Sequence, residues 1–153
     1  MILGWLRFLY NPIAFPAITA YVVSLIFKLV VSSWEHRHIN FRTMLKDGGM
    51  PSSHTAFVIG LATAIGLHEG TTTVFWVSAA FALVVMRDAM SVRYETGRQG
   101  KAINDIIEAV KLKGEFTENE LREVVGHTPL QVLIGFLVGF AASWASYALL
   151  FSI

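Results

Sequence analysis

The chain contains no cysteine, which excludes a disulfide framework and any site that depends on a thiolate. It is also poor in charge. Asp, Glu, Lys and Arg make up 15% of its 153 residues, whereas 54% are hydrophobic, and the mean hydropathy is +0.56. This balance is too apolar for a typical soluble domain of the same length. The net charge of +1 identifies no partner, so the positions of the few charges matter more than their sum.

Four segments almost without charge predict membrane helices. They cover residues 13–31, 52–67, 72–91 and 130–153. A helix needs roughly 17–25 residues to cross a bilayer, and the second and third segments reach that length only with their polar ends included. Small residues in the second segment favour close helix packing. The predicted fold is all-α, an integral membrane bundle of about four transmembrane helices in one domain. A soluble all-helical core is the alternative.

Two further segments flank these spans. Residues 1–11 are apolar with Trp5 and Arg7 among them, which predicts an interfacial helix that ends before Pro12. No small-residue cleavage site follows, so a signal peptide is not expected. Residues 93–128 are polar and predict a cytoplasmic insertion of two amphipathic helices lying over the bundle. The first is marked by apolar residues at helical spacing, the second by a capping box: Ile103, Ile106, Ile107 and Val110, and Thr117–Glu120. The alternative for this insertion is a solvated hairpin without chemistry.

Lysine and arginine are missing from the loop around Gly70 and from the C-terminus, and the N-terminus has only Arg7. The other two loops are basic, which by the positive-inside rule places them in the cytoplasm and both termini outside the cell membrane. Their basic residues are Arg37, Arg42 and Lys46 in one, and Arg93, Arg98, Lys101, Lys111, Lys113 and Arg122 in the other.

The run from Gly48 to Thr55 places two serines and a histidine at a predicted helix start. A helix N-terminus offers unpaired N–H groups and a positive dipole end, which suit an oxyanion. Glycine allows close approach to a ligand, and Pro51 suits the first turn. His54 is then a candidate proton shuttle beside the anion. The alternative is an ordinary helix cap followed by an incidental histidine.

The predicted topology brings other polar side chains to the same cytoplasmic level as His54. His127 precedes the fourth span, Asp88 and Arg93 follow the third, and Lys28 lies about one turn from the end of the first. Two histidines, several cations and two helix N-termini form a candidate anion site with proton-transfer capacity.

Phosphoryl transfer is the reaction class that such a site favours, because it needs charge stabilisation, a nucleophile and an acid for the leaving group. A neutral histidine can attack phosphorus and form a phosphohistidine that water hydrolyses. No Mg²⁺-type carboxylate cluster is evident, so a metal-independent phosphoric ester hydrolase without a cofactor is expected. The alternative is a metal ion held by His54, His127 and Asp88 with water as the nucleophile, but no tight histidine spacing supports it.

Three runs of the sequence resemble one family. They are G-G-M-P-S-S-H from Gly48, R-D-A-M-S-V-R from Arg87 and G-H-T-P from Gly126. P-S-S-H is similar to the P-S-G-H motif of the type 2 phosphatidic acid phosphatases, which are related to vanadium haloperoxidases. The three runs together resemble a divergent branch of that superfamily, called acid phosphatase/vanadium haloperoxidase-related, from Lys28 to the end of the chain.

The resemblance implies a role for each residue. His127 matches the nucleophile and His54 the general acid. Ser52 and Ser53 would hold phosphate oxygens, Arg93 matches the phosphate-binding arginine, and Lys28 is the candidate for the lysine of the family's first motif.

The chain also departs from the family pattern. The first motif, K-x6-R-P, is absent as written, and the third lacks its S-R pair before His127. Gln131 stands where the family has the aspartate that orients the nucleophile, and Asp88 is the candidate for that role. The ordinary family has six spans and usually an outward-facing site.

The function predicted is a membrane phosphatase that hydrolyses a lipid or isoprenoid phosphate at the cytoplasmic face. The alternative is a non-catalytic module that binds phosphorylated headgroups or scaffolds a partner. Nucleic-acid binding has no support. A homodimer is plausible, with Gly135 and Gly139 as a candidate contact.

Overall fold

The computed structural model describes residues 10–37, 41, 48–111 and 126–151. Five helices lie in these ranges, and they confirm a helical membrane bundle. They are α2 (Ala14–His36), α4 (Ser53–Glu69), α5 (Thr73–Met90), α6 (Val92–Lys111) and α7 (Pro129–Phe151). The predicted interfacial segment falls largely on residues 1–9, and the second amphipathic helix falls on residues 112–125; both lie outside the described residues.

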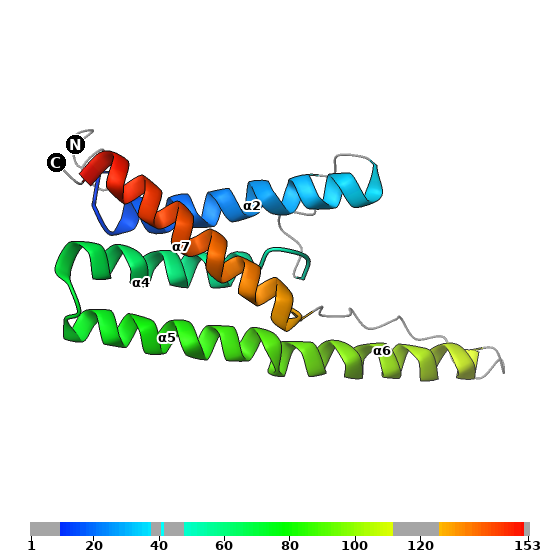
Figure 1. The fold of residues 1–153 in the computed structure, drawn as a ribbon. Coiled ribbons are helices and arrows are strands. Elements are labelled where there is room, and N and C mark those ends of the chain that lie inside the picture. The colour runs from blue at the N-terminus through cyan, green and yellow to red at the C-terminus, as the bar shows by residue number, and fades with distance from the viewer. Residues whose placement is uncertain (1–9, 38–40, 42–47, 112–125, 152–153) are drawn as a thin grey trace, which may run out of the picture.

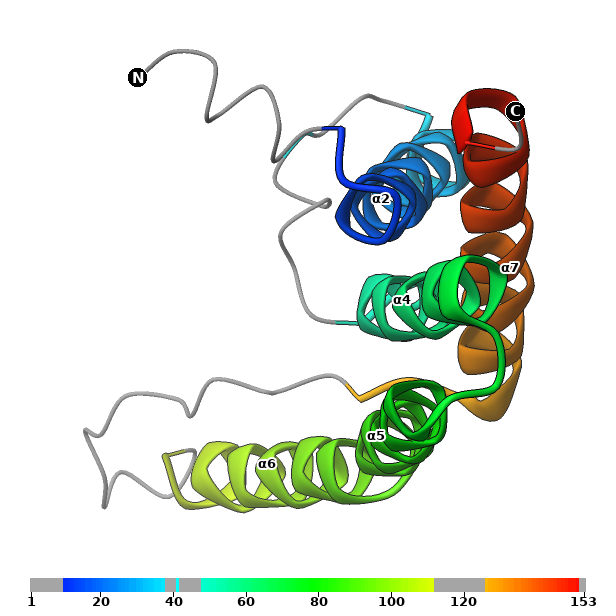
Figure 2. The ribbon, with the colours of Figure 1, turned by 90° about the vertical axis from the view of Figure 1, so that its left-hand side faces the viewer.

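Helix α4 occupies the centre of the bundle and packs against α2, α5 and α7 (Figures 1 and 2). Helix α7 crosses it diagonally, from the side of α5 at its start to the side of α2 at its end. Contacts between α5 and α7 are consequently few, whereas α7 packs extensively on both α4 and α2. This diagonal crossing determines the geometry of the candidate functional site and of the cavity between α4, α5 and α7, both described below.

Three helical stretches are long and apolar enough to cross a membrane: Ala14–Glu35, Thr73–Glu108 and Pro129–Phe151. Helix α4 has 17 residues and is covered on several sides by the other helices, with nine of its residues buried. Large apolar side chains are exposed on the outward faces of α5 and α7, including Val77, Val84 and Leu137. A lipid environment suits such faces, because in water a patch of this size would mark an interaction surface.

The two ends of the bundle differ in content. At one end the start of α2 meets the end of α7, where the rings of Phe15 and Phe151 lie 6.3 Å apart. His68 near the end of α4 lies there too, with Nδ1 3.2 Å from the Tyr147 hydroxyl. The opposite end gathers the end of α2, the start of α4, the end of α5 and the start of α7 (Figure 1). That opposite end carries most of the predicted site residues.

Glycines on α7 allow it to lie directly on α4. A Cβ atom at Gly135 would stand 2.6 Å from the Ser52 carbonyl oxygen, and one at Gly139 would stand 2.7 Å from the Cα of Ala56. Ser143 adds a buried hydrogen bond, its hydroxyl donating to the Gly60 carbonyl at 2.7 Å. Gly135 and Gly139 therefore face α4 within the chain, and the expected use of these glycines as a dimer contact is replaced by an internal one.

We expect Gly139→Ala to destabilise the protein by about 1–3 kcal/mol, because the added methyl group meets helix backbone that cannot rotate away. The thermal unfolding midpoint in detergent should fall. Ala141→Leu is the matched control, since Ala141 is exposed on the same helix. An unchanged midpoint for Gly139→Ala would contradict the close packing of α7 on α4.

Helix α6 follows α5 and extends past the bundle at an angle to it (Figures 1 and 2). The helical hydrogen bonds bridge the junction, since Ser91 N donates to the Arg87 carbonyl at 3.0 Å and Glu95 N to the Ser91 carbonyl at 2.9 Å. The first amphipathic helix thus begins well before its apolar stripe at Ile103. Among the described helices it packs against α5. It does not lie over the bundle as expected, since its contacts with the described helices are made to α5 alone.

Candidate functional site

The turn before α4 brings backbone close to a buried lysine. Gly48 and Gly49 have φ angles of 83° and 79°, a left-handed conformation that favours glycine. A Cβ atom at Gly49 would lie 3.2 Å from Cε of Lys28 on α2. Lys28 is only 5% exposed and is engaged in an interaction. The turn formed by Gly48 and Gly49 therefore places the start of α4 next to Lys28 of α2.

Ser52 connects α4 to α7. It is fully buried, and its hydroxyl oxygen caps α4 by accepting from Thr55 N at 3.4 Å and from the Thr55 hydroxyl at 3.0 Å. This is the ordinary chemistry of a helix N-cap. Its backbone N–H donates to the Gln131 carbonyl at 3.1 Å. These bonds give Ser52 a structural role, whereas Ser53, the first residue of α4, is 8% exposed.

His127 connects α7 to α5. Its backbone N–H donates to the carbonyl of Ala89 at 3.0 Å, and its side chain is buried, with the residue 6% exposed. Asp88, the neighbour of Ala89, is half-buried and engaged in an interaction. The end of α5 and the start of α7 therefore meet at the histidine predicted as nucleophile.

Gln131 holds the imidazole of His127. Its side-chain oxygen lies 3.3 Å from His127 Nδ1 and also accepts from Thr128 N at 3.0 Å. The second bond orients the amide, because a backbone N–H can only donate. The oxygen therefore faces the ring, so Nδ1 carries the proton and Nε2 keeps its lone pair in the neutral form.

Electrostatics favour that neutral form. Burial lowers the pKa of His127 below its ordinary value of 6.5, and the nearby positive charges of Lys28 and His54 lower it further. Hydrogen bonds to the Gln131 side chain and to the Gly49 backbone act in the opposite direction without reversing the result. His127 is therefore uncharged at neutral pH, the state in which an imidazole can attack phosphorus.

The predicted residues converge in large part. His127, His54, Lys28 and the two serines lie around the start of α4, and Asp88 lies beside the residue that binds the His127 backbone. His54 is exposed in the first turn of α4. Arg93 is the second residue of α6, but its side chain lies outside what the structure describes. Within the described ranges, no group of three or more His, Asp or Glu side chains is placed to hold a metal ion.

The role of Gln131 was missed in the sequence. The residue was noted only as a replacement for the orienting aspartate, and Asp88 was expected to act at the imidazole. Gln131 follows His127 by four positions across the start of a helix, the spacing at which side chains meet. That spacing was the available signal for a direct contact.

Comparison with known proteins agrees with these features. Residues 9–142 match the model of a family described as the Divergent PAP2 family. The chain belongs to this family. It is 30% identical over 135 residues to the uncharacterized membrane protein YuiD of Bacillus subtilis (strain 168). The aligned region covers 80% of this chain and 85% of that relative. No solved structure matches the chain.

Membership in the Divergent PAP2 family confirms the resemblance read from the three motifs. It makes the chain a membrane protein and suggests a phosphatase-like role at the membrane. Substrate and mechanism have to be argued from the chemistry of the residues themselves.

The contact between His127 and Gln131 can be tested without an assay of activity. We expect Gln131→Glu to raise the pKa of His127 by about 1–3 units, because a carboxylate at Nδ1 stabilises the imidazolium. Histidine NMR titration in detergent measures this, and His68 at the far end of α4 is the internal control. An unshifted His127 would contradict the contact.

The lowered pKa also predicts how stability changes with pH. As the pH falls from about 6.5 towards the lower pKa of folded His127, the unfolded chain binds more protons than the folded one. The free energy of unfolding therefore decreases over that range of pH.

Proposed function

We propose that this member of the Divergent PAP2 family is an integral membrane phosphatase. It hydrolyses a lipid or isoprenoid phosphate through a phosphohistidine on His127. The observation that supports this best is the placement of the His127 ring, which is buried, hydrogen-bonded to Gln131 through Nδ1, and close to Lys28 and His54.

In the first step Nε2 of His127 attacks phosphorus, and the bond from phosphorus to the leaving alkoxide oxygen breaks. Protonated His54 transfers its proton to that oxygen, so the product leaves as an alcohol. In the second step His54, now neutral, takes a proton from water as the water oxygen attacks phosphorus. The N–P bond breaks, phosphate leaves, and both histidines return to their starting states.

The remaining residues stabilise the charge on phosphorus. Lys28, Ser53 and the N–H groups at the start of α4 would bind the phosphate oxygens, with Arg93 from the start of α6 as a further donor. Asp88, at the end of α5, is the proposed positioning carboxylate. The carbonyl of its neighbour Ala89 accepts a hydrogen bond from the backbone N–H of His127. No step in this mechanism needs a metal ion.

The site is proposed to face the cytoplasm, with both termini outside. The end of α2 carries Arg37 and α6 carries Arg98 and Lys101, whereas the α4–α5 turn at the opposite end has no Lys or Arg. The ends of spanning helices lie at the level of lipid headgroups, and this supports a phosphate carried on a membrane lipid over a soluble one.

One observation favours a second candidate, a module that binds phosphorylated headgroups without turnover. The acceptor at His127 Nδ1 is the neutral amide of Gln131, where the resembled family has a carboxylate. A neutral partner stabilises the imidazolium less, so it supports proton transfer less strongly.

A phosphate-release screen on the purified protein in nanodiscs separates the two candidates. The panel includes phosphatidic acid, a prenyl monophosphate, a prenyl diphosphate and a soluble phosphate monoester. Release that His127→Gln abolishes and His68→Gln leaves intact supports the phosphatase, since His68 lies at the opposite end of α4. Saturable phosphate binding with no release across the panel would replace it with the binding module.

A further inference from the structure

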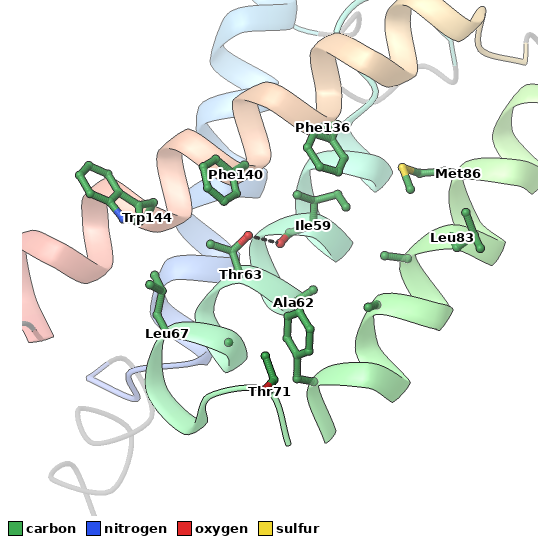
Figure 3. Close-up of a pocket in the computed structure, with 14 residues that line it drawn as sticks. Ile59, Ala62, Thr63, Leu67, Thr71, Leu83, Met86, Phe136, Phe140 and Trp144 are labelled. Atoms are coloured by element: carbon green, nitrogen blue, oxygen red, sulfur yellow. Dashed lines mark hydrogen bonds between the residues drawn. The ribbon is translucent and has the colours of Figure 1, made fainter. Parts of the chain in front are cut away.

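A cavity of about 690 Å³ lies between α4, α5 and α7. Figure 3 shows Ile59, Thr63 and Leu67 of α4 lining it, facing Leu83 and Met86 of α5, with Phe136, Phe140 and Trp144 of α7 along the other wall. We refer to this space as the α5–α7 groove. Its volume falls in the range of pockets that hold organic ligands.

The diagonal course of α7 produces the α5–α7 groove. Helix α7 lies beside α5 at the His127 end and diverges from it towards Trp144, so the two walls separate with distance from the site (Figures 1 and 2). Small residues of α4, Ala62 and Gly66, form part of the floor.

The walls offer almost nothing for a polar ligand. The lining contains no charged residue, and its polar side-chain groups are the hydroxyls of two threonines and the indole N–H of Trp144. The hydroxyl of Thr63 already donates to the Ile59 carbonyl at 2.8 Å, and Thr71 lies in the turn at the far end. The chemistry of the groove therefore suits a hydrocarbon.

The narrow end of the groove adjoins the candidate site on all three helices. Met86 lies three residues before Ala89, which binds the His127 backbone, and Phe136 lies five residues after Gln131. Ile59 lies two turns after Ser52 on the same face of α4. At 1.5 Å per residue these separations are about 5–10 Å along each helix.

We propose that the α5–α7 groove binds the hydrocarbon chain of the phosphorylated lipid whose head reacts at His127. The inference rests on the proposed function and adds the place of the tail. An apolar channel that leads to Lys28, two histidines and a helix N-terminus is complementary to an amphiphile with one anionic end. From Ile59 to Leu67 the floor runs about 12 Å, so the groove selects for a long chain over a short one.

Filling the groove tests this. Ala79→Trp places an indole on the α5 wall, whereas Ala80→Trp, on the adjacent exposed position outside the lining, is the matched control. We expect Ala79→Trp to lower kcat/KM about tenfold for a long-chain prenyl or acyl phosphate, the equivalent of about two buried methylene groups. Activity on a butyl phosphate should change less than about twofold, and Ala80→Trp should change neither. Equal losses on long and short chains for Ala79→Trp would overturn the proposal.

Photolabelling gives a readout that does not need turnover. Prenyl and acyl phosphates with a diazirine at the chain end are irradiated with the protein in nanodiscs, one probe in each arm. Labelling of α4 and α7 between Ile59 and Leu67 and between Phe136 and Trp144, displaced by the unlabelled phosphate but not by the corresponding alcohol, supports the groove. The arm that labels identifies the chain type.

Two outcomes would overturn the assignment. Labelling displaced equally by the alcohol would mean that bulk bilayer lipid fills the groove, and specific labelling found only outside the groove would mean that the chain binds elsewhere. Specific labelling without phosphate release in any assay would retain the groove and reject the phosphatase, so the two proposals fail separately.

Discussion

We expect His127→Gln to lower phosphate release by at least about 10³-fold, because the amide cannot form a covalent bond to phosphorus. The residue is well placed for that role. It is buried, Gln131 holds Nδ1, and burial lowers its pKa so that the ring is uncharged at neutral pH. Glutamine keeps a polar side chain that can still bond to Gln131, so loss of activity would report on the nucleophile and not on packing.

Rapid quenching with a ³²P-labelled substrate measures the intermediate directly. The wild type and His68→Gln should yield acid-labile labelled protein, and His127→Gln should yield none. Labelling of the His127→Gln protein, or phosphate release at the wild-type rate, would contradict the phosphohistidine mechanism.

We expect His54→Gln to separate the two chemical steps. For an alkyl phosphate, loss of the general acid should slow turnover by about 10²–10⁴-fold. For 4-nitrophenyl phosphate the leaving group needs no proton, so the first step should survive while hydrolysis of the intermediate, which needs His54 as base, becomes slow. His54 is exposed in the first turn of α4 and close enough for its charge to lower the pKa of His127, which fits such a shuttle.

The signature is a burst of one equivalent of 4-nitrophenol per protein followed by slow steady-state release. Stopped-flow absorbance detects both phases, and His68→Gln again serves as the control on the same helix. Equal losses for alkyl and aryl substrates without a burst would assign His54 to phosphate binding and not to proton transfer.

Local patterns in the sequence predicted much of this molecule. Uncharged runs marked the spanning helices, the P-S-S-H run marked the start of α4, and the three motifs together identified the family. Each of these signals lies within one segment. Burial of His127 and its proximity to Lys28 depend on how segments pack, but the charge count had already assigned both to the same end.

Features that depend on helix crossing were beyond such patterns. The apolar residues of the α5–α7 groove are spread over α4, α5, α7 and the α4–α5 turn, and no spacing in one helix distinguishes them from residues that face lipid. Gly135 and Gly139 have the spacing of a helix contact, but that spacing does not say whether the partner is α4 or a second chain. The contact of Gln131 with His127 required the orientation of one amide.

The double use of Gln131 has a consequence for biogenesis. Its backbone carbonyl accepts from Ser52 and its side chain accepts from His127, so one residue joins the start of α4 to the proposed nucleophile. Because His127 and Gln131 flank the start of the last described helix, a ribosome must deliver α7 into the bilayer before this arrangement can form. The proposed site would therefore be incomplete until α7 packs against α4.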